Sequence, residues 1–114
     1  MPFNDFDLHK IKNTVGKFCK EKTNPALADK VRLDYTIDKQ SVIVQEIRPR
    51  WNDPTQMMHL DVAKLKFIRS SGKWELYWKR ASGKWQRYEP DADKSELQEL
   101  VDVIAADQHG CFFG

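Results

Sequence analysis

The phrase Ser-Gly-Lys-Trp occurs twice in the chain, at residues 71–74 and 82–85, and a tyrosine follows each tryptophan after three residues. Apolar and polar residues alternate around both phrases, which is typical of half-buried β-strands. Glycine supplies the positive φ that a two-residue hairpin loop needs. The repeat therefore predicts two consecutive hairpins with Ser-Gly loops, and not an array of structural repeats.

Two-residue loops fix the register of the strands, because opposite residues lie equally far from the loop. The first loop places Phe67 opposite Leu76, and the second places Arg80 opposite Trp85. With this register, one face of the sheet is apolar and the other is polar. That separation supports the register, because a one-residue slip would exchange the two faces. The apolar face holds Ala63, Leu65, Phe67, Trp74, Leu76, Trp78 and Trp85, and the polar face holds Lys64, Lys66, Glu75, Tyr77, Lys79, Gln86 and Tyr88.

Helical periodicity appears at both ends of the chain. After a capping Asn4, apolar residues recur at three- and four-residue steps, and Thr23-Asn24-Pro25 ends this first helix. A second helix is predicted to open at Asp93, with Glu96 completing a capping box, and to end at Gly110. The stripe of the first helix consists of Leu8, Ile11, Val15, Phe18 and Lys22, and that of the second consists of Leu97, Leu100, Val101 and Ile104.

Between the helices the pattern predicts strands at residues 31–37, 41–47, 61–69, 73–80 and 84–89. Pro49 is expected to take the chain out of the sheet, because proline cannot donate a ladder hydrogen bond. We therefore expect an α+β fold with an N-terminal helix, a five-stranded antiparallel meander and a C-terminal helix. Both helices are expected on the tryptophan-bearing face, in a single domain that spans residues 1–114.

Length and composition narrow the class of protein. The chain has 114 residues, of which 40% are hydrophobic and 32% charged, as in an ordinary globular domain and unlike a disordered tail. No apolar run approaches the roughly 20 residues that a membrane helix needs, and the N-terminus lacks the pattern of a secretion signal. We expect a cytoplasmic protein without a membrane partner.

The chain has two cysteines, Cys19 and Cys111. A disulfide between them is not expected in the reducing cytoplasm, and Cys19 should act as a small hydrophobic residue.

A group of arginines and tryptophans does not fit a simple core. Trp78, Arg80, Trp85 and Arg87 would alternate across two strands on the interior face, and burying unpaired guanidinium groups is costly. They must lie at the edge of the sheet or meet carboxylates. The group is either a structural stack with internal salt bridges or a site for a phosphate, a carboxylate or a stacked base. The candidate ligand contacts are Arg48, Arg50, Trp51, Arg80, Trp85 and Arg87.

Charge is unevenly distributed along the chain, whose net charge is +2. Residues 30–89 carry thirteen basic and seven acidic side chains, whereas residues 90–114 carry one and six. Either an acidic helix neutralises a basic sheet, or the sheet attracts an anion such as nucleic acid. Basic and aromatic residues interleave on the sheet as they do in single-strand binders, but no RNA-binding signature is present.

The sequence contains no arrangement that predicts catalysis. His9, His59 and His109 are scattered, and the chain lacks a nucleophile elbow, a phosphate loop and paired metal-binding cysteines. His109 and Cys111 lie close together, but two ligands do not make a zinc site. Glu46 is a candidate general base, although we expect it to be the salt-bridge partner of an arginine. No metal or cofactor is expected.

Four phrases of the sequence together resemble a known family. They are EIRPRW at residues 46–51, WELYWKR at 74–80, KWQRYEP at 84–90 and GCFFG at 110–114. In combination they are similar to a bacterial family catalogued as a domain of unknown function, number 3024, and the likeness spans nearly the whole chain. The resemblance implies a small single-domain bacterial protein. It implies no catalytic residues, because the family brings no established activity.

Three functional hypotheses follow, in order of preference. The first is a non-enzymatic binding or interaction module, whose arginine and tryptophan group contacts an anionic ligand or a protein partner. The second is a nucleic-acid binder that uses the basic and aromatic sheet. The third is an enzyme or metalloprotein, which would have to contain a stoichiometric metal.

Overall fold

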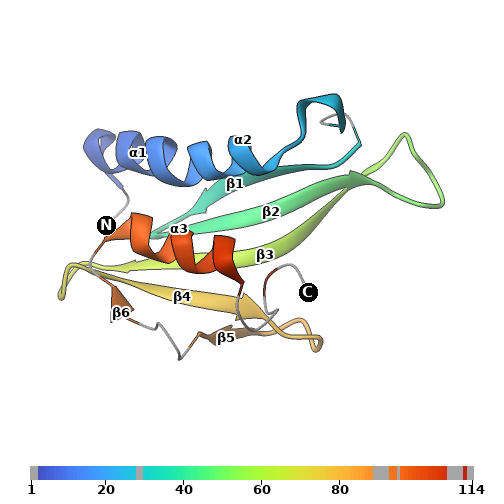
Figure 1. Ribbon diagram of the computed structural model, residues 1–114. Coiled ribbons are helices and arrows are strands. Elements are labelled where there is room, and N and C mark those ends of the chain that lie inside the picture. The colour runs from blue at the N-terminus through green and yellow to red at the C-terminus, as the bar shows by residue number, and fades with distance from the viewer. Residues whose placement is uncertain (1–2, 28–29, 89–92, 95, 108–111, 113–114) are drawn as a thin grey trace.

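The computed structural model describes residues 3–27, 30–88, 93–94, 96–107 and 112. It confirms an α+β fold, with an N-terminal helix, an antiparallel sheet and a C-terminal helix (Figure 1). The helical segments are α1 (Asp5–Ile11), η1 (Lys12–Gly16), α2 (Lys17–Lys22), η2 (Pro25–Leu27) and α3 (Leu97–Ala106). The strands are β1 (Arg32–Asp38), β2 (Ser41–Pro49), β3 (Met57–Ile68), β4 (Lys73–Lys79), β5 (Trp85–Arg87) and β6 (Asp93–Lys94).

The sheet is the expected meander in the order β1-β2-β3-β4-β5, and all its strand pairs are antiparallel. The short strand β6 was not expected. It pairs with β4 beyond the end of β5, so that Trp74 lies opposite Lys94. The predicted helix start at Asp93 is therefore wrong. Residues 93 and 94 extend the ladder along the edge of β4, and α3 begins only after Glu96.

One hydrophobic core lies between the helices and one face of the sheet, and Figure 1 shows the helices on the same side. The second predicted stripe lies entirely in this core, whereas Ile11, Val15 and Phe18 of the first stripe lie in it and Leu8 and Lys22 do not. Its most deeply buried large side chains are Ile11, Val15, Val42, Val44, Leu65, Leu76, Leu97, Leu100 and Ile104. No helix in the described part of the chain is long and apolar enough to cross a membrane.

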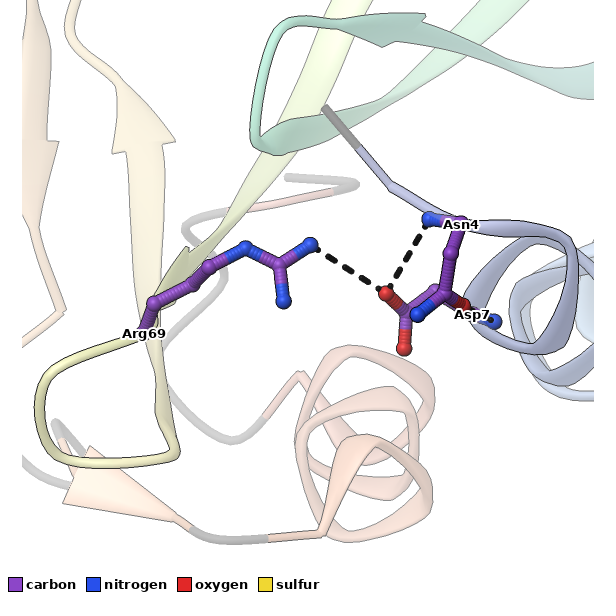
Figure 2. Close-up of polar contacts among 3 residues, drawn as sticks. All are labelled: Asn4, Asp7 and Arg69. Carbon is purple, nitrogen blue, oxygen red and sulfur yellow. Dashed lines mark hydrogen bonds and ion pairs between the residues drawn. The ribbon is translucent and has the colours of Figure 1, made fainter. Parts of the chain in front are cut away.

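The first helix starts at the predicted cap. Asn4 Oδ1 accepts a hydrogen bond from the amide of Asp7 at 2.8 Å, and the Asn4 amide donates to Asp7 Oδ2 at 3.3 Å. Figure 2 shows that Arg69 Nη2 donates to the same carboxylate oxygen, also at 3.3 Å. Arg69 lies in the turn between β3 and β4, so one carboxylate both caps the helix and ties it to the sheet.

The middle of the first helix, Lys12–Gly16, is a π-helical segment. A π turn holds more residues than an α turn, so the residues that follow it rotate relative to those before it. The predicted apolar stripe changes accordingly: Leu8 remains 38% exposed, whereas Cys19 is buried in the core. The close approach to the sheet also explains Gly16, because a Cβ atom at this position would lie 3.2 Å from Tyr35 Cε1.

The Cys19 thiol gives a testable consequence of this packing. Burial, aided by the charge of Asp34, raises its pKa from 9.0 to about 12, which lowers the thiolate fraction at pH 8 about a thousand-fold. This loss outweighs the higher nucleophilicity of a more basic thiolate. In a Cys111→Ser variant we therefore expect the folded protein to react with a chromogenic disulfide reagent at least ~30-fold more slowly than the protein unfolded in guanidinium. Equal rates would show that Cys19 is accessible.

The first hairpin differs from the predicted one by two residues. Ile68 lies opposite Lys73, so the loop has four residues, and the Gly72 amide donates to the Ile68 carbonyl at 2.8 Å. Gly72 has the positive φ that the sequence predicts, but it occupies the last position of the longer loop. Phe67 therefore pairs with Trp74 instead of Leu76. A shift of two residues keeps every side chain on its predicted face.

The second hairpin differs by one residue, which exchanges the faces of β5. The Arg80 amide donates to the Lys84 carbonyl at 2.9 Å, and Gly83, again with positive φ, ends a three-residue loop. Trp85 consequently lies opposite Lys79 and not opposite Arg80. The prediction that all three tryptophans of the meander share the core face is wrong for Trp85. Tyr88, predicted on the polar face, is instead only 3% exposed and belongs to the core.

Two further boundaries differ from the sequence-based expectation. β2 continues through Pro49, which lies opposite Met57, because the hydrogen-bonded pair that closes this hairpin is Arg50 with Gln56. The missing amide of Pro49 is therefore not needed for pairing with β3. It is not needed on the other side either, because β1 starts at Arg32, opposite Ile47, and does not reach the level of Pro49. At the other end of the chain, α3 stops at Ala106, where Asp107 adopts a left-handed conformation. Gly110, the predicted end, lies outside the described residues.

Candidate functional site: the outer face of the sheet

The six predicted contact residues lie on two different hairpins. Arg80, Trp85 and Arg87 belong to the β4–β5 hairpin, where the Arg80–Lys84 hydrogen bond brings Arg80 next to the start of β5. Arg48 is near the end of β2, and Arg50 and Trp51 begin the loop to β3.

The structure does not bring these two groups together. Arg48 of β2 lies opposite Met58 of β3. Lys79 of the β4–β5 hairpin lies two strands away from Arg48 and about three residues away along the strand direction, so the two residues are roughly 14 Å apart in the sheet. Arg48 forms an ion pair with Glu46, which confirms the arginine partner predicted for that glutamate. Trp51 is 91% exposed at the tip of the hairpin.

The sheet has a second face, opposite the helices, which we call the outer face. Strand alternation assigns its residues, because their neighbours Ala63, Leu65, Trp74 and Leu76 point into the core. No described helix packs on this face. On β2–β5 its polar and aromatic members are Ser41, Gln45, His59, Asp61, Lys64, Lys66, Lys73, Glu75, Tyr77, Lys79, Trp85 and Arg87.

A row of polar contacts crosses four strands of the outer face. Gln45 Nε2 donates to Asp61 Oδ1 at 2.9 Å, and Lys79 Nζ donates to Asp61 Oδ2 at 2.7 Å. The same ammonium group lies 5.0 Å from the centre of the Trp85 ring. Burial would raise the pKa of Asp61, but the hydrogen bonds from Lys79 and Gln45 and the charge of Lys79 lower it below 3.8. Asp61 is therefore a charged member of this row at neutral pH.

Asp61 reaches the outer face because of a bulge in β3. Val44 lies opposite Ala63 while Gln45 lies opposite Asp61, so Val62 is an additional residue in the ladder. Without it, Asp61 and Ala63 would share the core face, since they are two residues apart. The bulge thus turns the carboxylate away from the core and toward Lys79.

A second row centres on Tyr77, which lies opposite Lys64 on one side and Arg87 on the other. Lys64 Nζ is 6.0 Å from the centre of the tyrosine ring. The hydroxyl of Tyr77 donates to Glu75 Oε1 at 2.8 Å, and Arg87 pairs with Glu75 Oε2 at 3.5 Å. Burial and the hydrogen bond and charge of Glu75 raise the pKa of Tyr77, so its hydroxyl stays neutral and remains a donor.

The outer face has an excess of positive charge. On β2–β5 it carries five Lys or Arg side chains and two carboxylates, and both carboxylates already pair with a cation, Asp61 with Lys79 and Glu75 with Arg87. On β1, Arg32, Asp34 and Asp38 alternate with core-facing residues, which brings the face to six basic and four acidic side chains. Among the described residues, no carboxylate lies within ion-pair distance of Lys64, Lys66 or Lys73.

Sequence reasoning placed Lys64, Lys66, Tyr77 and Lys79 on this face, and the strand register confirms that placement. It missed that Trp85 and Arg87 join them, and it missed Asp61 altogether. The polar–apolar alternation of 84–88 is equally compatible with either face. Only the length of the preceding loop decides between them.

The described residues contain no group of three or more His, Cys, Asp or Glu side chains that could hold a metal ion. His109 and Cys111, the residues considered for a metal, lie outside the described part of the chain. Phe112 is described: it is buried, its ring centre is 5.2 Å from that of Tyr88, and its amide donates to Asp107 Oδ1 at 3.1 Å. The chain therefore folds back onto the core at Phe112.

Comparison with known proteins supports the resemblance noted in the sequence. Searches of the curated proteins and of the solved structures give no match. A family model described as Domain of unknown function (DUF3024) matches residues 3–114, which is nearly the full length of the chain. On this match, the chain belongs to the DUF3024 family.

Proposed function

We propose that the protein is a non-enzymatic binding module that contacts an anionic ligand with the outer face of its sheet. The observation that carries this proposal is the unneutralised charge around Lys64, Lys66 and Lys73, beside the half-buried rings of Tyr77 and Trp85. A surface of this kind attracts anions and offers aromatic planes for stacking. Arg87 borders Trp85 on the same hairpin and retains its predicted role as a ligand contact. Arg80, the ladder position after Lys79, alternates to the other face of the sheet.

The internal ion pairs support a role in recognition by fixing the orientation of the binding groups. Lys79 is held between Asp61 and the Trp85 ring, and Arg87 is held beside Glu75. Side chains that are already ordered lose less conformational entropy when a ligand binds. Lys64 and Lys66 then supply the long-range attraction, which should weaken as salt screens it.

Binding to inorganic polyphosphate at low and physiological salt tests this proposal. We expect saturable binding that weakens with salt, and at least a five-fold loss of affinity in a Lys64→Gln/Lys66→Gln variant, because two uncompensated cations are removed. A Lys12→Gln/Lys20→Gln variant removes the same charge from the first helix, outside the outer face, and serves as the matched control. Equal losses in both double variants, or no binding at low salt, would contradict the proposal.

A single-stranded nucleic acid is the second candidate ligand, and the placement of the two rings favours it. Tyr77 and Trp85 are diagonal neighbours on β4 and β5, because Tyr77 lies opposite Arg87 and Trp85 opposite Lys79. Aromatic residues on an open sheet are a common platform for stacked bases, and alanine substitution of one costs about 1–3 kcal/mol. A Trp85→Ala variant should therefore lose about ten-fold in affinity for a labelled oligothymidylate while it still binds polyphosphate.

A further inference from the structure

A groove of about 940 Å³ lies on the other side of the molecule, between the first helix and the edge strand β1. Its floor is largely apolar and is formed by Gly16, Cys19, Leu33 and Tyr35. This volume is in the range of small-molecule sites, which are typically lined by apolar groups with a few polar ones.

Two contacts hold the walls of the groove in place. At its middle, the helix backbone approaches the ring of Tyr35 so closely that a Cβ at Gly16 would lie 3.2 Å from Tyr35 Cε1. At one end, the Leu33 amide donates to Thr23 Oγ1 at 3.0 Å, and Thr23 Oγ1 donates to the Cys19 carbonyl at 2.8 Å. The groove is therefore a fixed feature of the packing of helix on strand.

The same contacts argue against an added peptide strand as the occupant. A peptide that extends a sheet needs the free amides of the edge strand. On β1, Leu33 already donates its amide to Thr23, and Tyr35 donates its amide to Asp34 Oδ1 at 2.8 Å. An occupant that needs no backbone pairing fits this edge better.

The rim of the groove is positively charged. Lys12 and Lys20 lie four residues before and after Gly16 on the same side of the helix, about 12 Å apart. Arg32 lines the groove from β1. Among the described residues, none of these three cations has a carboxylate within ion-pair distance, whereas Lys17 pairs with Glu21 at 3.9 Å. Asp34 is the acidic residue at the rim.

An apolar floor under a cationic rim points to a ligand with an apolar body and an anionic head. We propose that this groove binds a fatty acid, with its carboxylate at Lys20 and Arg32 and its chain along Cys19, Leu33 and Tyr35. Lys20 and Arg32 both line the groove and can reach one head group from opposite walls, one from α2 and one from β1. The site is separate from the outer face and does not depend on the function proposed there.

Calorimetric titration with dodecanoate below its micelle concentration tests the site. We expect one saturable site per chain and at least a ten-fold loss of affinity in the Lys20→Gln/Arg32→Gln variant, because both head-group contacts are removed. The Lys64→Gln/Lys66→Gln variant has lost the same charge on the outer face and should bind dodecanoate as the unaltered protein does. Octanoate should bind at least ten-fold more weakly than dodecanoate, since four methylenes fewer are buried.

A ligand with the same alkyl chain but a cationic head distinguishes binding at this site from nonspecific hydrophobic binding. Dodecyltrimethylammonium should not compete with dodecanoate, because its head would lie among the cations of the rim. Competition by this compound, equal binding by both double variants, or the absence of any heat from dodecanoate would overturn the proposal. Circular dichroism of each variant shows that it is folded, so a lost affinity reports on the groove.

Discussion

Replacing Trp74 with alanine is expected to destabilise the protein by about 3–5 kcal/mol, the cost of removing a large aromatic side chain from a packed core. Trp74 is 6% exposed, and its ring centre lies 5.8 Å from that of Phe3 and 5.0 Å from that of Phe67. The indole therefore joins the segment before α1 to two central strands. Urea denaturation followed by circular dichroism measures the loss as a lower midpoint with an unchanged slope.

Two variants keep this prediction falsifiable if the alanine variant does not fold. Trp74→Phe retains an aromatic ring in the same place and should cost clearly less than the alanine substitution. Trp51→Ala removes the same side chain from a position that is 91% exposed and should change stability by less than about 0.5 kcal/mol. Equal effects of Trp74→Ala and Trp51→Ala would mean that Trp74 is not part of the core.

The order of the strands was predictable because local signals agree with one another. Alternation marks the strands, and the glycines at 72 and 83 mark the reversals, where both have the positive φ expected of a hairpin. A glycine with positive φ, however, ends a three- or four-residue loop as readily as it occupies a two-residue one. The sequence therefore locates each turn but does not determine its length.

Whether a loop is longer than predicted by an even or an odd number of residues decides which side chains keep their predicted face. The first loop is longer than expected by two residues, so Trp74 and Trp78 keep the predicted face although their partners change. The second is longer by one, so Trp85 and Arg87 move to the outer face and Tyr88 moves to the core. Because of this one additional loop residue, Arg87 is not buried beside a tryptophan in the core. It forms an ion pair with Glu75 on the outer face instead.

Other features depend on contacts between distant segments. The bulge at Val62, the π-helical segment Lys12–Gly16 and the strand at Asp93 each adapt one element to the neighbour on which it packs. Local propensity contains no information about that neighbour. For the same reason, the separation of Arg48 from the β4–β5 hairpin follows from the extra length of β2 and β3, which extend as a pair beyond the rest of the sheet.

The exchange of faces on β5 predicts opposite outcomes for two neighbouring aromatic residues. Tyr88→Ala is expected to cost about 3–5 kcal/mol, because Tyr88 is 3% exposed and packs against Phe112 with ring centres 5.2 Å apart. Trp85→Ala should cost no more than about 1 kcal/mol, because the indole lies on the outer face and loses mainly its contact with Lys79. Urea denaturation of the two variants measures both values.

The two-residue loop that the repeat first suggests would reverse this order, with Trp85 in the core and Tyr88 outside it. A larger loss for Trp85→Ala than for Tyr88→Ala would therefore contradict the three-residue loop at 81–83. It would also remove the aromatic platform from the outer face, since Tyr77 would then lack its diagonal neighbour on β5. The stability of these two variants thus tests the surface on which the proposed anion binding depends, before any ligand is known.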